Sequence, residues 1–339
     1  CAPQSDESLS PGGRSNGGVA YVLFGHTGDF SDIFLSGWDT SLGFRIFGAQ
    51  QNDGLGISVA RAGDVNGDGI ADCVVGSVWA NAGNGAAYVV YGRRNSVPFA
   101  DIDLASFVSG ALGYRVLGYQ AGGMFAFSVG GGADVNGDGI DDAVIGAYSE
   151  SVGFQGEAGA VYVIPGRLGT SQGDVDVSVP NLQHGAFKVT GEPGSWTGYA
   201  VALVRDHDGD GYGEVLAGAP QAAFHGRTNS GATYIIYGRV DQPTSQPSSQ
   251  PSMIEGNIDL ADGPTVTTPF LTMTGAVHDD QFAFAVGSAG DFNGDGYTDI
   301  VIGARYADPF GRDAAGTAYV IYGRPGHSTD EFWMGADAA

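Results

Sequence analysis

A nine-residue acidic segment occurs four times in this chain. In each copy, oxygen-bearing side chains occupy positions 1, 3, 5 and 9, as in Asp-Val-Asn-Gly-Asp-Gly-Ile-Asp-Asp at residues 134–142. Hard divalent cations such as Ca²⁺ prefer six to eight oxygen ligands around one point, several of them carboxylates. Glycines at positions 4 and 6 allow the tight turn that aims alternate side chains inward. One copy could be a solvated acidic turn, but four copies predict calcium loops.

Each loop is expected to bind one Ca²⁺ through four side chains and through the backbone carbonyl of position 7. The first predicted site is Asp64, Asn66, Asp68, Ile70 and Asp72, and the second is Asp134, Asn136, Asp138, Ile140 and Asp142. The third is Asp206, Asp208, Asp210, Tyr212 and Glu214, and the fourth is Asp291, Asn293, Asp295, Tyr297 and Asp299. The third loop is the least regular, because it has Glu where the others have Asp.

The residues after each loop exclude an EF-hand. An EF-hand needs a bidentate Glu at position 12 and a following helix. Position 12 is apolar in all four copies, where Val75, Ile145, Ala217 and Ile302 stand. The surrounding runs, such as Ala-Val-Ile-Gly, are short, apolar and ended by Gly, which predicts buried strands. A dockerin-type loop, which also leads into a helix, is disfavoured for the same reason.

A second motif shows that the whole chain is built from repeats. Segments like Gly-Ala-Ala-Tyr-Val-Val-Tyr-Gly at residues 85–92 occur five times, and the first Asp residues of successive acidic loops are 70, 72 and 85 residues apart. Each unit of about seventy residues is predicted to contain, in this order, a strand of small residues, the acidic loop, an apolar strand, the strand formed by the second motif (the Tyr strand) and a last strand. Four antiparallel strands per unit, repeated radially, predict an all-β fold of the β-propeller class, with the calcium loops between the first and second strands.

The predicted domain organisation is one propeller region over residues 1–339, incomplete at both ends. It contains half a unit, three whole units and three quarters of another, which is 17 strands or four to five blades. Small residues in the first strands suit the crowded centre of a propeller, and the Tyr and Phe side chains are expected to pack between sheets. The Pro/Ser/Gln-rich segment 242–252 is predicted to be a solvated loop insertion.

Composition excludes several classes of function. The net charge of −24 disfavours nucleic-acid binding, and four Ca²⁺ would reduce it to −16. No segment is long and apolar enough to cross a membrane, so no membrane contact is expected within this chain. Two cysteines make neither a disulfide scaffold nor a zinc site, and Cys1 and Cys73 are expected to be too far apart to pair. The chain has no nucleophile elbow, Walker loop or zinc-protease motif, so no catalytic residue is expected.

These motifs resemble the FG-GAP repeats of integrin α-subunit β-propellers over nearly the whole chain. The Phe-Gly positions that name the family read Leu55-Gly56, Phe125-Ala126, Thr197-Gly198 and Phe282-Ala283, while the acidic loops follow the family pattern. The resemblance implies a seven-bladed ring with structural Ca²⁺ on the face opposite the ligand site. It also implies an extracellular or cell-surface location, where millimolar calcium suits loops of this type.

Three functions remain open on the sequence. The first is a calcium-stabilised propeller that mediates protein–protein or cell–matrix adhesion through a protein partner, with glycans as a further candidate. The second is a structural subunit of an extracellular polymer or filament, with neighbouring subunits as partners. The third is an accessory propeller of a secreted enzyme. The variable turns are the candidate contact regions, and they carry the aromatic residues Trp79, Tyr148, Phe154, Phe224 and Phe310.

Overall fold

The structure is a computed structural model of the chain. It describes residues 13–25, 27, 32–94, 100–151, 156–170, 172–179, 182, 185–238, 257–263, 270–326 and 332–333. Cys1, Phe154 and the predicted insertion at 242–252 lie outside the described residues, and the prediction for each of them stays untested.

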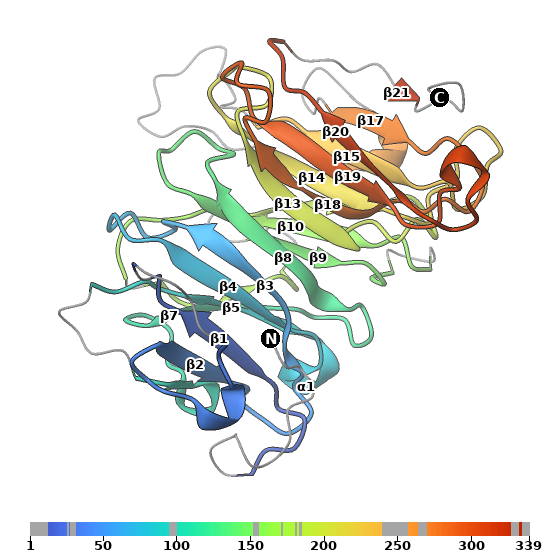
Figure 1. Cartoon of the computed structure of the whole chain (residues 1–339). Helices are drawn as coiled ribbons and strands as arrows, with labels where there is room; N and C mark the ends of the chain where they lie inside the picture. Colours follow the sequence, from blue (N-terminus) through green and yellow to red (C-terminus); the bar gives the residue numbers. More distant parts are fainter. Residues whose placement is uncertain are drawn as a thin grey trace.

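The described residues form five sheets, which confirms the all-β prediction (Figure 1). The first sheet contains β1 (Val19–Leu23), β2 (Gly43–Phe47) and β6 (Ile102–Asp103). The second contains β3 (Leu55–Gly63), β4 (Asp72–Ser77), β5 (Ala86–Val90), β7 (Gly113–Leu117) and β11 (Val175–Asp176). The third contains β8 (Phe125–Ala133), β9 (Asp142–Ala147), β10 (Ala160–Ile164), β12 (Phe187–Thr190) and β16 (Ile258–Asp259).

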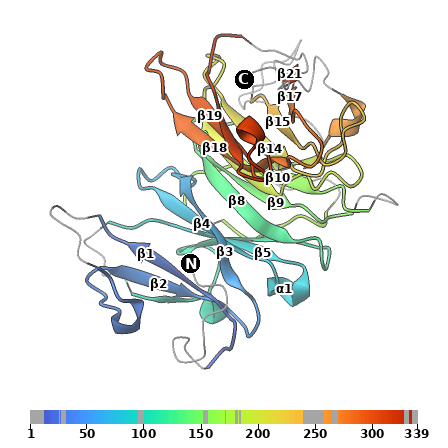
Figure 2. The same ribbon diagram turned by 45° about the vertical axis from the view of Figure 1, so that its right-hand side comes forward.

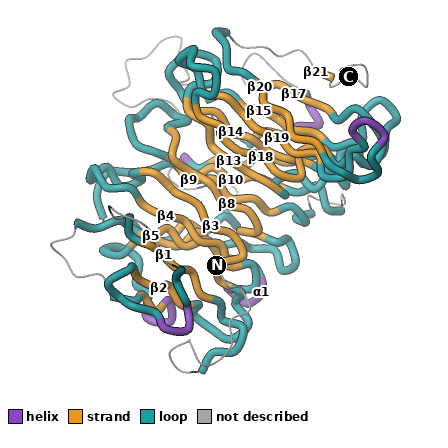
Figure 3. The backbone as a smooth tube through the Cα atoms, viewed as in Figure 1, coloured by secondary structure: helices purple, strands orange, loops and turns teal. Residues whose placement is uncertain are grey.

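Two further sheets complete the described structure. The fourth contains β13 (Ala200–Arg205), β14 (Gly213–Ala219), β15 (Ala232–Ile236), β17 (Phe270–Thr274) and β21 (Phe332–Trp333), and the fifth contains β18 (Phe282–Gly290), β19 (Asp299–Ala304) and β20 (Thr317–Ile321). Helical segments are short, as Figure 3 shows: α1 (Ala80–Gly83) and the 3₁₀ turns Leu35–Gly37, Leu104–Ser106, Leu260–Asp262 and Pro309–Gly311.

Successive sheets lie side by side through their first strands. β3 packs beside β8, β8 beside β13, and β13 beside β18, so these four strands form the inner row of the molecule (Figure 1; Figure 2 shows β3, β8 and β18 from another side). They are rich in Gly, Ala, Ser and Val, because neighbouring sheets leave little room there. For example, a Cβ added to Gly131 of β8 would lie only 2.8 Å from the Cα of Ala62 in β3. The packing of successive sheets through their first strands is consistent with the predicted β-propeller class.

Four of the five sheets contain one strand more than the sequence predicts. Among the 21 strands in the described residues, these four are the two-residue strands β6, β11, β16 and β21, and the others lie where the sequence predicts strands. Each of the four pairs in parallel with the last strand of the preceding sheet, as β6 does with β2. The cause is a preceding polar residue: the Asp101 carboxylate accepts from the backbone N–H of Arg45 at 2.8 Å and from its guanidinium. Asp174 binds Arg115 in the same way.

The Tyr strands supply much of the core, as the sequence predicts. Tyr88, Tyr162 and Tyr234 are buried, and Tyr162 packs edge-on against Phe125 with ring centroids 5.4 Å apart. Because Phe125 begins the first strand of the same sheet and both side chains project between sheets, they help to fill the junction.

A glycine before the Tyr strand of each of the first four sheets allows neighbouring sheets to touch through their backbones. Gly159 has a φ of +76°, and a Cβ on it would collide with the carbonyl oxygen and the nitrogen of Thr197 in the next sheet. The two residues form an isolated parallel bridge, and the Thr197 N–H donates to the Ala158 carbonyl at 3.2 Å. Gly18 and Gly231 make the same bridge to Leu55 and Phe282. The glycine that opens the Tyr motif is therefore required by contact between sheets.

We expect Gly159→Ala to lower the free energy of unfolding by more than about 2 kcal/mol. The substitution combines the cost of a left-handed backbone with a clash against rigid backbone atoms. Gly173→Ala is the control, since that glycine has open space around it and an ordinary φ. Urea denaturation measures both variants, and equal midpoints would contradict the role given to Gly159.

Candidate metal centres

Each acidic loop joins the first and second strands of its sheet, as predicted. The second loop, for example, follows β8 and ends at Asp142, the first residue of β9. The four loops are also neighbours in space. The carbonyl of position 1 in each loop accepts a hydrogen bond from the N–H of position 8 in the next loop, through the pairs Asp64–Asp141, Asp134–Gly213 and Asp206–Thr298. A continuous line of loops therefore crosses the sheet junctions at one end of the molecule.

A second set of backbone bonds holds the loops to the neighbouring sheet. In the first loop, the carbonyls of Val65 and Asn66 accept from the N–H groups of Arg167 and Gly169 at 2.9 and 2.8 Å. Those two donors follow the Tyr strand of the next sheet. The same bonds recur in the third loop, where His207 and Asp208 accept from Arg324 and Gly326. The conformation of a loop thus determines how two sheets join.

In three of the loops, the side chains of positions 1, 3 and 5 turn inward around the loop's own N–H groups. In the second loop, Asp134 accepts from Gly137 at 2.6 Å and from Gly139 at 2.7 Å. The Asp138 N–H lies 3.2 Å from an Asp134 oxygen and 2.9 Å from the Asn136 oxygen. The first and fourth loops repeat this pattern. Oδ1 of Asp134 accepts two of these bonds, whereas Oδ2 of Asp134 and the Asn136 oxygen accept one each and keep a lone pair that could be offered to a cation.

The carboxylate of position 9 fastens the loop to the second and third strands. Asp142 is fully buried, and its two oxygens accept from the N–H groups of Val135 at 2.8 Å and of Gly166 at 2.9 Å. Gly166 lies just after the Tyr strand. Asp72 and Asp299 make the equivalent pairs of bonds. In the second, third and fifth sheets, one acidic side chain therefore joins segments that are distant in sequence.

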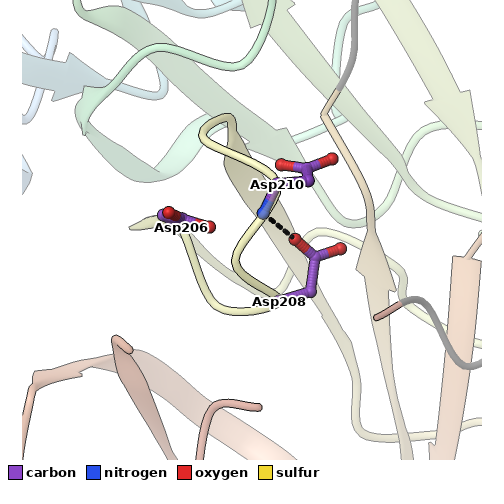
Figure 4. Close-up of side chains that lie close together, drawn as sticks. All are labelled: Asp206, Asp208 and Asp210. Atoms are coloured by element: carbon purple, nitrogen blue, oxygen red, sulfur yellow. Dashed lines mark hydrogen bonds between the residues drawn. The ribbon is translucent and has the colours of Figure 1, made fainter. Parts of the chain in front are cut away.

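The third loop is organised differently, and Figure 4 shows its three aspartates. Single carboxylate oxygens of Asp206, Asp208 and Asp210 lie within 4.8 Å of one another. The Asp210 N–H donates to Asp208 at 3.2 Å, and the Asp206 N–H donates to the Tyr212 carbonyl at 3.0 Å. The loop ends in Glu214, whose Oε2 accepts a hydrogen bond from the backbone N–H of His207 at 2.7 Å.

This loop contains buried oxygens without a hydrogen-bond partner in the described residues. They include Oε1 of Glu214, a fully buried residue, and Oδ1 of Asp206. A buried polar atom without a partner is costly, and a buried charge without one is more so. A cation bound in this loop would lower the electrostatic cost of these buried oxygens. The donor set of hard, anionic oxygens thus fits Ca²⁺.

Burial changes the acidity of these groups in the direction that a cation would reverse. Loss of solvent raises the pKa of Asp72 to about 7 and that of Glu214 to about 9, and it raises the pKa of Asp142 well above its usual value. Neighbouring loop carboxylates raise all three further, against the bonded N–H groups, which lower them. The charged loops are therefore electrostatically unfavourable without a positive charge nearby.

The structure brings the predicted ligands of each loop into one turn, with differences in exposure. Asn66, Asn136 and Asp208 are buried at position 3, whereas Asn293 is exposed. The difference arises because the described residues contain no further sheet packed against the fifth one. Binding of a metal by the four predicted ligand sets stays a prediction.

Sequence reasoning did not identify an aromatic cluster at the opposite end of the inner strands. The cluster consists of Phe127, Tyr148, Trp196, Tyr199, Phe284 and Tyr306, with Arg305 above the Phe284 ring at 3.9 Å. Tyr199 lies at its centre, 5.1 Å from the Phe127 and Tyr148 rings and 4.7 Å from the Phe284 ring. A signal was present, because Phe127, Tyr199 and Phe284 occupy the same position of three repeats.

A family model and individual relatives match this chain. The FG-GAP repeat model matches residues 125–164, 197–236 and 283–321, which are the first three strands of the third, fourth and fifth sheets. Integrin alpha-5 of Xenopus laevis is 30% identical over 275 residues, which is 80% of this chain and 21% of that protein. Integrin alpha-PS2 of Drosophila melanogaster is 29% identical over 258 residues, 75% of this chain and 15% of that protein.

A phosphatidylinositol-glycan-specific phospholipase D of Bos taurus is also similar, with 30% identity over 201 residues, 59% of this chain and 21% of the enzyme. The chain thus spans about a fifth of the length of these relatives. Among the described residues, no helix has the length and apolar character needed to cross a membrane. The repeats matched by the family model and the similarity to integrin α-subunits over most of the chain identify it as an integrin-alpha-like FG-GAP repeat protein.

Proposed function

We propose that this chain is part of an extracellular, calcium-stabilised β-propeller that mediates adhesion through a protein partner. The observation that carries the proposal is the line of four acidic loops across the sheet junctions of an integrin-α-like FG-GAP chain. In this proposal the four loops bind Ca²⁺, and the ring of blades closes as in the family. The chain itself contributes binding and no catalysis.

The role of calcium in this proposal is to fix the angle between sheets. A bound ion would neutralise the carboxylates of positions 1, 5 and 9, which otherwise repel one another. Backbone N–H and carbonyl groups of the same loops form the hydrogen bonds that join one sheet to the next. Ion binding therefore stabilises the sheet junctions as well as the loop.

The aromatic cluster is the partner surface that the fold favours. β8 begins at Phe125, and the acidic loop begins after its last residue, Ala133, so the strand separates the two ends by about 25 Å at ~3.3 Å per residue. Aromatic residues and Arg are the side chains most enriched in protein interfaces. Tyr306 is 45% exposed and Arg305 is exposed, which leaves part of the cluster available for contact.

A second candidate function has support from one comparison. The similarity to phosphatidylinositol-glycan-specific phospholipase D shows FG-GAP repeats in an enzyme, and it favours an accessory role beside a catalytic domain as the alternative.

The third candidate, a subunit of an extracellular polymer, predicts that isolated chains assemble. Sedimentation velocity over a range of concentrations separates it from the proposed function, for which the chain stays at one size.

Removal of calcium is expected to destabilise the protein strongly. At a hundredfold excess over Kd, each independent site contributes about 2.7 kcal/mol. Loss of four sites therefore lowers Tm by on the order of 10 °C. Thermal melts in 1 mM CaCl₂ and in EDTA measure the change, and calcium added in excess of EDTA is the control. Mg²⁺ should restore less, because it needs a smaller octahedral site. A melt that is unchanged in EDTA would refute the structural role of calcium.

Glu214→Gln should separate calcium binding from packing in the third loop. In this variant a neutral amide replaces a buried carboxyl group that has an oxygen without a hydrogen-bond partner. Without metal, the Tm of the variant in EDTA should therefore equal or exceed that of the unsubstituted chain. With calcium, the lost ligand charge should reduce the rise in Tm. Glu150→Gln is the matched control, because Glu150 is equally buried but pairs with Lys188 and the hydroxyl of Tyr162. That variant should lose stability equally in both buffers, and an unaltered calcium response in Glu214→Gln would exclude Glu214 as a ligand.

Charge reversal at the aromatic cluster should weaken partner binding without unfolding the chain. Arg305→Glu places a negative charge over the Phe284 face, and we expect at least tenfold less retention of the extracellular partner on the immobilised chain. Arg312→Glu is the control, because Arg312 also lies over an aromatic ring, that of Phe310, but outside the cluster. Quantitative mass spectrometry of proteins retained from the native extracellular medium measures both. Equal losses in the two variants would argue against this surface.

A further inference from the structure

A cavity of about 490 Å³ opens at the junction of the first and second sheets, away from the aromatic cluster. Asn16 lies before β1, the segment from Gln50 to Asp53 lies between β2 and β3, and Trp79 follows β4. These segments lie at the end of the sheets opposite the acidic loops. The volume falls within the roughly 300–1,000 Å³ of ligand-binding pockets.

The lining of the cavity is rich in carboxamides. Asn16, Gln50, Gln51 and Asn52 are all exposed and line it together. Each carboxamide both donates and accepts hydrogen bonds, which matches a ligand whose groups also do both, such as a hydroxyl. The cavity is lined by no Lys or Arg, and its one carboxylate, Asp53, is only 5% exposed and accepts from the Gln50 N–H at 2.7 Å. The chemistry therefore favours a neutral, hydroxyl-rich ligand over a charged one.

Trp79 supplies an apolar surface beside these amides. It is 45% exposed, and the six-membered ring of its indole lies against the backbone of Gly54, where a Cβ would collide with it. Two backbone hydrogen bonds hold the main chain of Trp79. Its backbone N–H donates to the Asp53 carbonyl at 3.3 Å, and its carbonyl accepts from the Gly83 N–H at 3.1 Å. The face of an indole is electron-rich, so it attracts the slightly positive C–H groups on the apolar face of a sugar ring.

The cavity is formed before any ligand binds. The side-chain amide of Asn16 donates to the side-chain oxygen of Asn52 at 3.1 Å. In the backbone, the Gly54 N–H donates to the Asn16 carbonyl at 3.2 Å and the Asn52 N–H donates to the Ser15 carbonyl at 3.0 Å. These bonds join the segment before β1 to the segment before β3, which belong to different sheets. A ligand therefore meets the side chains of Asn16 and Asn52 already joined to each other, which lowers the ordering cost of binding.

We propose that this cavity binds a neutral oligosaccharide, with one sugar ring on Trp79 and its hydroxyl groups bonded to the carboxamides of Asn16, Gln50 and Asn52. The site is separate from the acidic loops and from the aromatic cluster, so it adds a glycan-binding activity to the proposed adhesion function without depending on it.

The test is titration of the calcium-loaded chain with soluble neutral hexasaccharides of the cellulose, β-1,3-glucan, chitin, mannan and xylan types. Intrinsic tryptophan fluorescence and calorimetry report binding up to about 10 mM ligand, a range that detects weak single-site affinities. We expect at least one of them to bind and to shift the fluorescence. The absence of binding by all five would overturn the proposal, as would a sulfated oligosaccharide that binds more tightly than every neutral one.

Two variants locate the site. Trp79→Ala should weaken binding at least tenfold. Gln50→Ala changes an exposed side chain and keeps the backbone N–H that donates to Asp53, so it should weaken binding while Tm is kept. Phe310→Ala is the matched control, because Phe310 is 86% exposed in the corresponding turn of the fifth sheet. Equal affinity in Trp79→Ala and Phe310→Ala would show that the sugar binds elsewhere and would overturn the assignment. Neither result alters the expected effects of EDTA or of Arg305→Glu.

Discussion

The buried carboxylate at position 9 of each acidic loop is the interaction on which the other contacts depend. Asp142 shows the principle: one side chain accepts from the N–H that opens its own loop and from the N–H that ends the Tyr strand. Without it, two N–H groups in a dry junction would lack acceptors, and each would cost about 1–3 kcal/mol. The loop held in this way then bonds to the next sheet through Asp134 and Gly213. A local acidic motif thereby sets the spacing of whole sheets.

This constraint separates the two ends of the sheets. At the loop end, backbone and carboxylate groups join one sheet to the next. At the opposite end, the turns after the second strands vary in sequence and carry the side chains exposed to a partner, among them Trp79 and Tyr306. Function on variable loops of a rigid scaffold is the general expectation, and here the acidic loops provide the rigidity.

The sequence predicted what is local and periodic. The spacing of Asp64, Asp134, Asp206 and Asp291 correctly placed a loop between the first two strands of each sheet, and the Tyr motifs located the third strands. It did not predict the strands in the connectors, because a two-residue run such as Ile102–Asp103 carries no periodic signal and pairs only through the contact of Asp101 with Arg45. The aromatic cluster was missed for a different reason: Phe127, Tyr199 and Phe284 do recur at one position of three repeats, but the repeat pattern does not show that side chains from three sheets meet.

The four loops are not equivalent, although their sequences nearly are. In three of them, Asp at position 1 is satisfied by the loop's own N–H groups, so the turn can persist without a cation. In the third, Glu214 has one more methylene than Asp, and one of its buried oxygens has no hydrogen-bond partner, while Asp206 has another. An ion at that position would relieve more unfavourable energy than at the others. Because this loop joins the fourth and fifth sheets, that junction is where loss of the proposed ion would first loosen the structure.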